Sequence, residues 1–301
     1  MLDDSLKQKY PWLRVRTTVE EYVAPDYYDK LLKEYVFDGK TDLGIFREFL
    51  TQVKPDHDLR VLELGCGPGR ATDIALAELA GRVSSVQLVD LSNQMLGASE
   101  RRFSMHPELR YFQDDSLHFL EKADGRYDIV FSLWSFSHSV HQVLSVMGME
   151  EGERYVEGVL RKFFTTNLAP GADFFLIHFD SCSDEQRILM RQWKKVFPIF
   201  ADTEHQSPSQ QLVSSTFRKL SEEGLVNFKE EHLVGEKIVY ANLGEAMETF
   251  MNFHLESYFN DSPLLPEIIE ELERYFLQYI TPSGSIEIRP GCFISIVKRL
   301  P

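Results

Sequence analysis

The hydrophobic positions between residues 58 and 181 change repeatedly from the spacing of a strand to that of a helix. Short apolar runs predict strands, and helical spacing is clear at Ala71, Ile74, Ala75 and Leu79. This alternation predicts a doubly wound, Rossmann-like α/β fold with a mostly parallel sheet. The predicted strands of this core, residues 58–182, are Leu59–Leu64, Val83–Leu91, Leu109–Phe112, Tyr127–Trp134 and Phe174–Phe179.

The regions on either side of this core have different patterns. Residues 1–57 show helical spacing, and we expect them to form an N-terminal helical segment that covers the ligand site. Residues 183–301 predict the end of the sheet together with a helical lid inserted before the last strand. This gives a seven-stranded sheet in one structural domain. The flanking patterns are helical over 27–35, 43–53, 188–197, 212–223, 244–258 and 265–279, and strand-like over 226–239 and 292–297.

A glycine-rich turn follows the first predicted strand, in the stretch VLELGCGPG at residues 61–69. Glycine lets the main chain bend sharply and lets a ligand approach it closely, and open α/β sheets bind ligands at the carboxyl ends of their strands. The dinucleotide fingerprint is G-x-G-x-x-G, whereas here the spacing is G-x-G-x-G, with Glu63 two residues before Gly65. A carboxylate would repel a pyrophosphate but attract a sulfonium ligand with an α-amino group. The motif therefore favours S-adenosylmethionine over NAD.

Acidic residues also stand at the ends of the next two predicted strands. Asp90 ends the second strand, where a carboxylate can accept hydrogen bonds from both ribose hydroxyls. Asp114, Asp115 and Ser116 follow the third strand, where a carboxylate can accept a hydrogen bond from an adenine amine. Asp90 has an alternative role at the start of a helix, because Ser92 is a typical N-cap residue.

Taken together, these four elements resemble the class I S-adenosylmethionine-dependent methyltransferase family over about residues 58–180. The resemblance implies that the methionine part of the cofactor is held near Glu63 and the glycine loop, the ribose at Asp90, and the adenine amine at Asp115 rather than Asp114. Pro170-Gly171 matches the family's turn before the fifth strand, although Ala172 replaces a glycine often found there. The cofactor-binding residues that the resemblance implies are Glu63, Gly65, Cys66, Gly67, Asp90, Leu91, Met95, Asp115, Ser116, the segment Ser132–Trp134, and Tyr27 or Tyr28.

Three histidines near the ends of the fourth and fifth strands are candidates for accepting a proton from a substrate. His138 and His141 follow the fourth strand, in what we expect to be a loop, and His178 ends the fifth strand two residues before Asp180. We take His138 and His178 as the catalytic candidates, with a His178/Asp180 pair as a means of orienting a nucleophile. The alternative for His138 and His141 is a solvent-exposed or hydrogen-bonded loop position, and for His178 it is a structural role with its hydrogen bonds satisfied.

The C-terminal third is similar, though without a specific motif, to histamine N-methyltransferase and its relatives. Its predicted lid carries aromatic side chains that suit a substrate wall, because aromatic faces attract cations. Packing inside the lid is the alternative, since such a stripe at helical spacing commonly belongs to a core. The substrate-binding candidates are Trp134, Phe250, Phe253 and Tyr258.

Composition narrows the classes of partner. The 301-residue chain carries a formal net charge of -15, which disfavours a nucleic-acid phosphate backbone. The N-terminus begins Met-Leu-Asp-Asp-Ser, unlike a signal peptide, and no apolar run suits a membrane span. Three scattered cysteines lack metal-type spacing and suit a reducing compartment. These features predict a cytoplasmic protein without a metal, membrane or nucleic-acid partner.

We therefore expect an enzyme, monomeric or homodimeric, that methylates a nitrogen or oxygen of a small molecule by in-line displacement. The acidic charge tilts this expectation towards an amine. The alternatives are a protein or RNA methyltransferase, a non-catalytic adenosyl-binding regulatory module, and an NAD-dependent oxidoreductase, which the glycine spacing and Glu63 disfavour.

Overall fold

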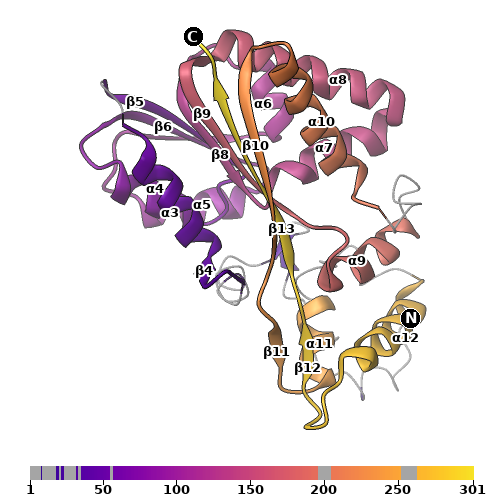
Figure 1. The fold of residues 1–301 in the computed structure, drawn as a ribbon. Coiled ribbons are helices and arrows are strands. Elements are labelled where there is room, and N and C mark those ends of the chain that lie inside the picture. Colours follow the sequence, from indigo (N-terminus) through magenta and orange to yellow (C-terminus); the bar gives the residue numbers. More distant parts are fainter. Residues whose placement is uncertain are drawn as a thin grey trace.

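The computed structural model describes residues 8, 18–19, 22–23, 32, 35–54, 57–195, 205–251 and 263–301. Its centre is a seven-stranded sheet with the order β10-β13-β9-β8-β5-β6-β7 (Figure 1). All strands run parallel except β13, which pairs antiparallel with both β9 and β10. The predicted fold class is confirmed. The strands are β5 (Leu59–Leu64), β6 (Val83–Asp90), β7 (Leu109–Gln113), β8 (Tyr127–Leu133), β9 (Leu168–Phe179), β10 (Val226–Val234) and β13 (Gly291–Arg299).

Helices cover both faces of the sheet, so successive side chains of a central strand enter different cores. Phe131 and Phe175 pack in the core that includes α3 and α4, whereas Val130 and Phe174 pack in the core that includes α7 and α8. This two-sided burial explains the nearly continuous apolar runs of β8 and β9. The helices are α3 (Asp42–Gln52), α4 (Arg70–Glu78) and α5 (Asn93–Arg102) on the first face, and α6 (Ser116–Lys122), α7 (Phe136–Met147), α8 (Met149–Lys162) and α10 (Pro208–Glu222) on the second.

Helix α7 replaces the loop that we expected after the fourth strand. Its N-cap residue, Ser135, makes no side-chain capping bond and already has helical backbone angles. The sequence signal for a helix start is therefore weak, although Ser92 and Asp115 do cap α5 and α6 through their side chains. The expectation of a loop at residues 135–141 was wrong for this reason.

Strand β9 begins earlier than the predicted Phe174. It starts at Leu168, directly after a short π-helix at Phe163–Asn167, and it includes the Pro170-Gly171 pair. The register against β8 shifts between Tyr127 and Ile129, and Gly171 has a positive φ of 80°. The Pro-Gly pair therefore marks an irregularity within the strand rather than the turn before it.

A long antiparallel ribbon carries the helical lid beyond the sheet. Strands β10 and β13 continue into β11 (Ile238–Tyr240) and β12 (Ile286–Ile288), which pair with each other. Between them lie α11 (Leu243–Thr249), α12 (Leu265–Phe276) and a 3₁₀ turn (Leu277–Tyr279), at the far end of the ribbon in Figure 1. Helix α9 (Asp184–Lys194) joins this group because the Tyr275 hydroxyl donates to the carbonyl of Asp184 at 2.6 Å.

The N-terminal region contains more than the expected helices. Its described part holds two short antiparallel strand pairs, β1 (Thr18–Val19) with β2 (Tyr22–Val23), and β3 (Val36–Phe37) with β4 (Lys40–Thr41). The second pair contacts the lid ribbon, since the Glu236 N–H donates to the Val36 carbonyl at 2.7 Å. It thereby brings the start of α3 close to the carboxyl edge of the sheet.

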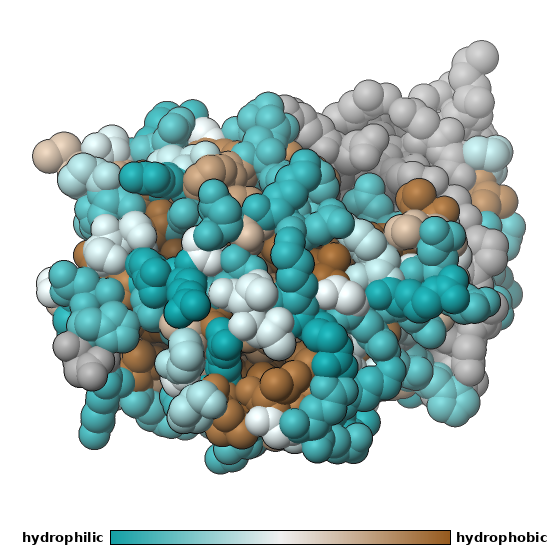
Figure 2. All heavy atoms as spheres, turned by 90° about the horizontal axis from the view of Figure 1, so that it is seen from above, coloured by the Kyte–Doolittle hydropathy of each residue, from teal (hydrophilic) through white to brown (hydrophobic). Residues whose placement is uncertain are grey.

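The surface agrees with the charged composition. Figure 2 views the molecule from above, and hydrophilic residues cover most of this face while hydrophobic ones form small groups. None of the helices in the described ranges is long and apolar enough to cross a bilayer.

The docking of α3 against the sheet gives a stability prediction. Phe46 is fully buried, with its ring 4.5 Å from that of Phe131 and 5.3 Å from that of Phe175. We expect Phe46→Ala to lower the free energy of unfolding by about 3–5 kcal/mol, because it leaves a cavity between helix and sheet. Urea titration followed by circular dichroism measures the change. The neighbouring exposed variant Arg47→Ala is the control, and equal losses in both would contradict the packing described.

Candidate active site

The loop between β5 and α4 is built from glycines with positive φ. Gly65, Gly67 and Gly69 have φ values of 72°, 52° and 91°. A Cβ on Gly65 would lie 1.9 Å from the Ser135 hydroxyl oxygen, so only glycine allows α7 to begin this close to the loop. A Cβ on Gly67 would meet no atom within 4 Å, so the main chain there borders open space. The loop is therefore packed on one side and open on the other.

The carboxylate of Asp90 ties this loop to the neighbouring strand. One oxygen accepts a hydrogen bond from the Gly67 N–H at 2.8 Å, and the other accepts one from the Ser92 N–H at 2.9 Å. Burial raises the pKa of Asp90, although these main-chain donors oppose the increase. Asp90 thus organises the loop and the start of α5 at the same time, and the second of these is the helix-start role considered for it.

Glu63 lies beneath the loop and is almost fully buried. The Thr72 hydroxyl donates a hydrogen bond to it at 2.5 Å. Burial raises the pKa of Glu63 to about 8, the Thr72 bond opposes this, and the nearby Asp90 adds to it. A buried carboxyl of this kind gains most from a cationic neighbour, because such a neighbour stabilises its ionised form.

The two aspartates after β7 have different partners. Asp115 is the N-cap of α6, where its side chain accepts from the N–H groups of Leu117 and His118. Asp114 accepts from the Asp115 N–H at 2.9 Å and contacts the His118 ring nitrogen Nδ1 at 2.5 Å. Both aspartates line the same pocket as Asp90.

One pocket gathers most of these groups at the carboxyl ends of β5, β6, β7 and β8. The space between these groups comprises about 980 Å³, a volume that includes solvent at its open side. Its only Lys or Arg among the described lining residues is Arg70. The predicted residues that line it are Glu63, Gly65, Cys66, Gly67, Asp90, Leu91, Met95, Asp115, Ser116, Trp134 and His138, and those not singled out from the sequence include Leu32, Arg70, Ala71, Ser135, Ser139 and Gln142.

This geometry coincides with a match to a known domain. Residues 61–150 match the family model of the methyltransferase domain, and this range includes the glycine loop, Asp90, Asp115 and the start of α7. The chain therefore contains a methyltransferase domain. No curated protein matched it by sequence.

Several solved structures resemble this methyltransferase at low sequence identity. The YcgJ protein from Bacillus subtilis is 12% identical, with 86% of this chain and 98% of that chain covered and a TM-score of 0.49. An rRNA methylase from Streptococcus thermophilus is 12% identical (87% and 98% covered, TM-score 0.42). N-methyltransferase NodS from Bradyrhizobium japonicum is also 12% identical (85% and 94% covered, TM-score 0.43). These TM-scores lie below 0.5, so the family assignment relies on the domain match and the pocket.

Helix α7 supplies one wall of the methyltransferase pocket. His138, Ser139 and Gln142 face it from successive turns, as the spacing of three and four residues requires. Desolvation lowers the pKa of His138, and it lowers that of His141, which lies off this wall, to about 3. Recognising α7 in the sequence would have identified Gln142 together with His138.

Two predicted site residues on the central strands lie outside the pocket lining. Ser132 lies on β8 and His178 on β9, both buried on the face covered by α7 and α10. Within the described residues, neither the Ser132 hydroxyl nor either ring nitrogen of His178 has a hydrogen-bond partner. Burial lowers the pKa of His178 to about 4, so its imidazole is neutral at pH 7.

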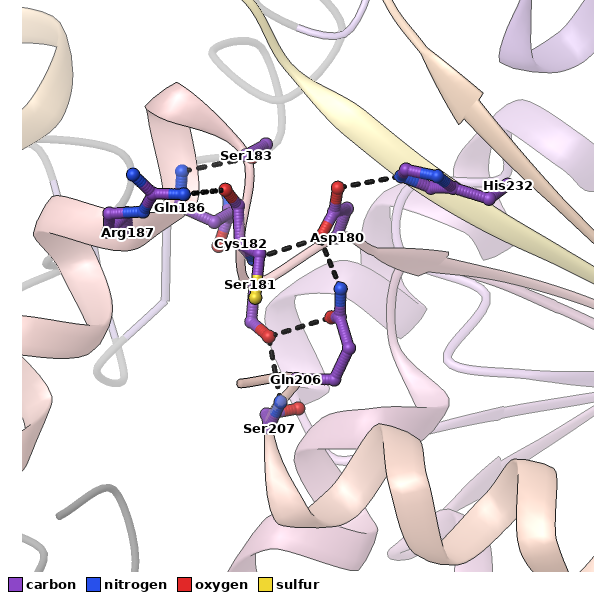
Figure 3. Close-up of polar contacts among 9 residues, drawn as sticks. All are labelled: Asp180, Ser181, Cys182, Ser183, Gln186, Arg187, Gln206, Ser207 and His232. Carbon is purple, nitrogen blue, oxygen red and sulfur yellow. Dashed lines mark hydrogen bonds and ion pairs between the residues drawn. The ribbon is translucent and has the colours of Figure 1, made fainter. Parts of the chain in front are cut away.

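Asp180 has other partners than the expected His178. Its carboxylate accepts from the Cys182 N–H at 2.8 Å and the Gln206 side-chain amide at 2.7 Å, and it lies 2.7 Å from the His232 ring (Figure 3). Ser181 extends the network to Gln206. The cluster joins the end of β9 to the approach to α10 and to β10, which indicates a structural anchor for the lid.

The aromatic substrate candidates divide between pocket and packing. Trp134 lines the pocket, while Phe250 is buried inside the lid, with its ring 4.6 Å from that of Phe276. Three further candidates, Tyr27, Phe253 and Tyr258, lie outside the described residues, as does Tyr28.

The open side of Gly67 gives a test of the pocket. We expect Gly67→Ala to fold, with a stability loss of about 1–2 kcal/mol for the left-handed backbone, and to bind S-adenosylhomocysteine on the order of ten-fold more weakly, because the methyl group occupies ligand space. Isothermal titration calorimetry measures the affinity. Gly81→Ala is the matched control, because Gly81 also has a positive φ (73°) and open space at its Cβ but does not line the pocket. Equal binding by both variants would contradict this assignment.

The buried Glu63 gives a pH dependence. Its pKa is about 8 in the folded chain and 4.5 for an ordinary glutamate, so between these values the folded chain keeps a proton that the unfolded chain has released. The contribution of Glu63 to the free energy of unfolding therefore falls as the pH rises through this window. We expect the stability of Glu63→Gln, which cannot ionise, to fall less than that of the wild type across the window. Urea titrations at several pH values test this, and parallel profiles for the two proteins would refute it.

Proposed function

We propose that this methyltransferase transfers the methyl group of S-adenosylmethionine to a nitrogen or oxygen of a small molecule. The observation that carries the proposal is the pocket at the carboxyl edge of the sheet, where Glu63, the glycine loop, Asp90 and Asp115 converge. The cofactor carries a cationic group, a ribose and an adenine in succession. The pocket has a carboxyl group for each, those of Glu63, Asp90 and Asp115.

The chemistry of the lining residues fits the cofactor. Glu63 is a buried carboxyl whose ionisation a sulfonium or α-ammonium group would favour. Both Asp90 oxygens have lone pairs beyond those used by Gly67 and Ser92, so they can accept from the ribose hydroxyls. Asp115 uses one oxygen, Oδ1, for the helix cap, which leaves Oδ2 for the adenine amine. Leu91 and Met95 supply the apolar surface for the adenine ring.

In the proposed reaction, S-adenosylmethionine supplies a methyl group already activated by the positive sulfur. The chain must then align the acceptor with that methyl group and exclude water. Leu133, Trp134 and Ser135, at the end of β8, line the pocket and form the wall beside the donor. His138 lies in the same pocket and is the residue placed to accept a proton from the acceptor. His178, which does not line the pocket, has no role in this scheme.

Charge supports a small acceptor over a nucleic acid. The pocket holds the carboxyl groups of Asp90, Asp114 and Asp115, besides that of Glu63, whose pKa is about 8, against one described cation, Arg70. Together with the net charge of -15, this repels a phosphate backbone and favours a neutral or cationic acceptor. A lid carried on its own ribbon beyond the sheet suits an enclosed small substrate, and the amine remains the favoured class.

Calorimetry tests the cofactor assignment. We expect the wild type to bind both S-adenosylmethionine and S-adenosylhomocysteine, and Asp90→Asn to bind the latter at least about ten-fold more weakly, because a hydrogen bond to a charged group contributes roughly 1.5–3 kcal/mol. The exposed Asp73→Asn is the matched control. Absence of heat with either ligand, on folded wild-type protein, would reject the proposal.

The acceptor class needs a separate measurement. Mass spectrometry of reactions with panels of small amines, small alcohols, peptides and RNA identifies which panel gains a methyl group. We expect products from the small amines or alcohols. Methylation confined to peptides or RNA would replace the small-molecule assignment.

A further inference from the structure

Asp42, which lies outside the methyltransferase-domain match, makes a dense set of contacts beside the pocket. It is the first residue of α3 and is fully buried. Its carboxylate accepts from Arg70 Nη1 at 3.0 Å and Nη2 at 3.3 Å, from the Trp134 indole N–H at 2.8 Å, and from the Leu43 N–H at 2.8 Å. Two of these partners, Arg70 and Trp134, line the pocket.

The strand order shows which end of the pocket these residues occupy. Asp90 ends β6 and Asp115 follows β7, on one side of the glycine loop, while Trp134 follows β8, on the other side. The adenosine part of the cofactor takes the Asp90 side under the proposed function. Its methionine part therefore lies towards Glu63 and Trp134. Arg70, the first residue of α4, stands directly after the glycine loop at this end.

The methionine part carries a carboxylate as well as an α-ammonium group. Glu63 suits the ammonium group, but a carboxylate in the same pocket needs a cation. Arg70 is the only described Lys or Arg in the pocket lining. A guanidinium has five N–H donors in a rigid plane, so it can serve Asp42 and a second carboxylate together. Asp42 fixes the plane of that guanidinium through two of its nitrogens.

Trp134 is held in an unusual conformation by the same carboxylate. Its φ is 68°, which is rare for a residue other than glycine and is commonly found at functional sites. Its ring packs at centroid distances of 5.6 Å from Tyr35, 6.3 Å from Phe37 and 4.4 Å from Phe179. The indole N–H is a polar group of this aromatic cluster, and Asp42 accepts its hydrogen bond.

We propose that Asp42 is a positioning residue that sets Arg70 to bind the methionine carboxylate of the cofactor and joins this site, through the Trp134 indole, to the wall after β8. The proposal rests on the proposed function for the identity of the cofactor. It assigns one buried carboxylate the task of keeping the cofactor's amino-acid end and the acceptor side in a fixed relation.

A pair of ligands tests this role apart from general stability. S-adenosylhomocysteine carries the amino-acid carboxylate, whereas 5′-methylthioadenosine has the same adenosine and thioether without it. We expect Asp42→Asn to weaken the binding of S-adenosylhomocysteine on the order of ten-fold, with 5′-methylthioadenosine bound within about two-fold of the wild type. Calorimetry measures both, and Glu48→Gln, an exposed carboxylate on the same helix, is the matched control. An equal loss for both ligands, or no loss, would overturn the proposal.

Two further variants keep the test decisive if Asp42→Asn does not fold. Arg70→Lys retains the charge but loses the planar fork, and we expect the same selective loss for S-adenosylhomocysteine. Trp134→Phe removes the indole donor and keeps an aromatic ring. We expect it to weaken S-adenosylhomocysteine binding about three-fold alone and to add nothing in an Asp42→Asn background, because both changes act through the same carboxylate. Additive losses would show that Trp134 acts independently of Asp42.

The outcomes also separate this proposal from the proposed function. If folded wild-type protein binds neither ligand, both proposals fail. If the wild type binds S-adenosylhomocysteine but Asp42→Asn and Arg70→Lys bind it equally well, only the role of Asp42 and Arg70 is rejected.

Discussion

The hydrogen bond from the Gly67 N–H to the Asp90 carboxylate is the contact on which the site depends. It holds a loop of left-handed glycines against the next strand, and the second oxygen of Asp90 fixes the start of α5. Because Gly65 has no side chain, α7 can begin against the same loop. Three neighbouring strand ends are thus brought to one small area, and the pocket is the space left between them.

The pocket concentrates carboxyl groups whose ionisation the folded chain makes unfavourable. Glu63 and Asp90 are both buried, and burial raises the pKa of each, so the folded chain holds carboxyl groups in a state that water would not favour. Ionisable groups whose pKa values are shifted by burial are typical of functional sites. Trp134, which has a strained backbone φ, lines the same pocket, and its indole N–H donates a hydrogen bond to Asp42. The features that cost stability are therefore collected where the cofactor is proposed to bind.

The sequence predicted those features of the fold and site that are determined by residues close together along the chain. The strand before the glycines, the acid at the end of β6 and the cap at Ser92 are local patterns, and the structure has each of them. The strand order and the partners of isolated polar residues are not local. Asp42 lies 28 residues from Arg70 and 92 from Trp134, so no spacing pattern links them. The converse error also occurs. His178 and Asp180 are close in sequence and were expected to form a pair, but the Asp180 carboxylate contacts the His232 ring instead.

The ribbon beyond the sheet has a consequence for how such a chain can change over evolution. The segment between β10 and β13 leaves and re-enters at positions that face each other, Val234 and Gly291. Everything it carries, from β11 to β12, can therefore be exchanged for another module without altering the order of the sheet or the glycine loop. A chain organised in this way can acquire a new acceptor while its donor site is inherited unchanged.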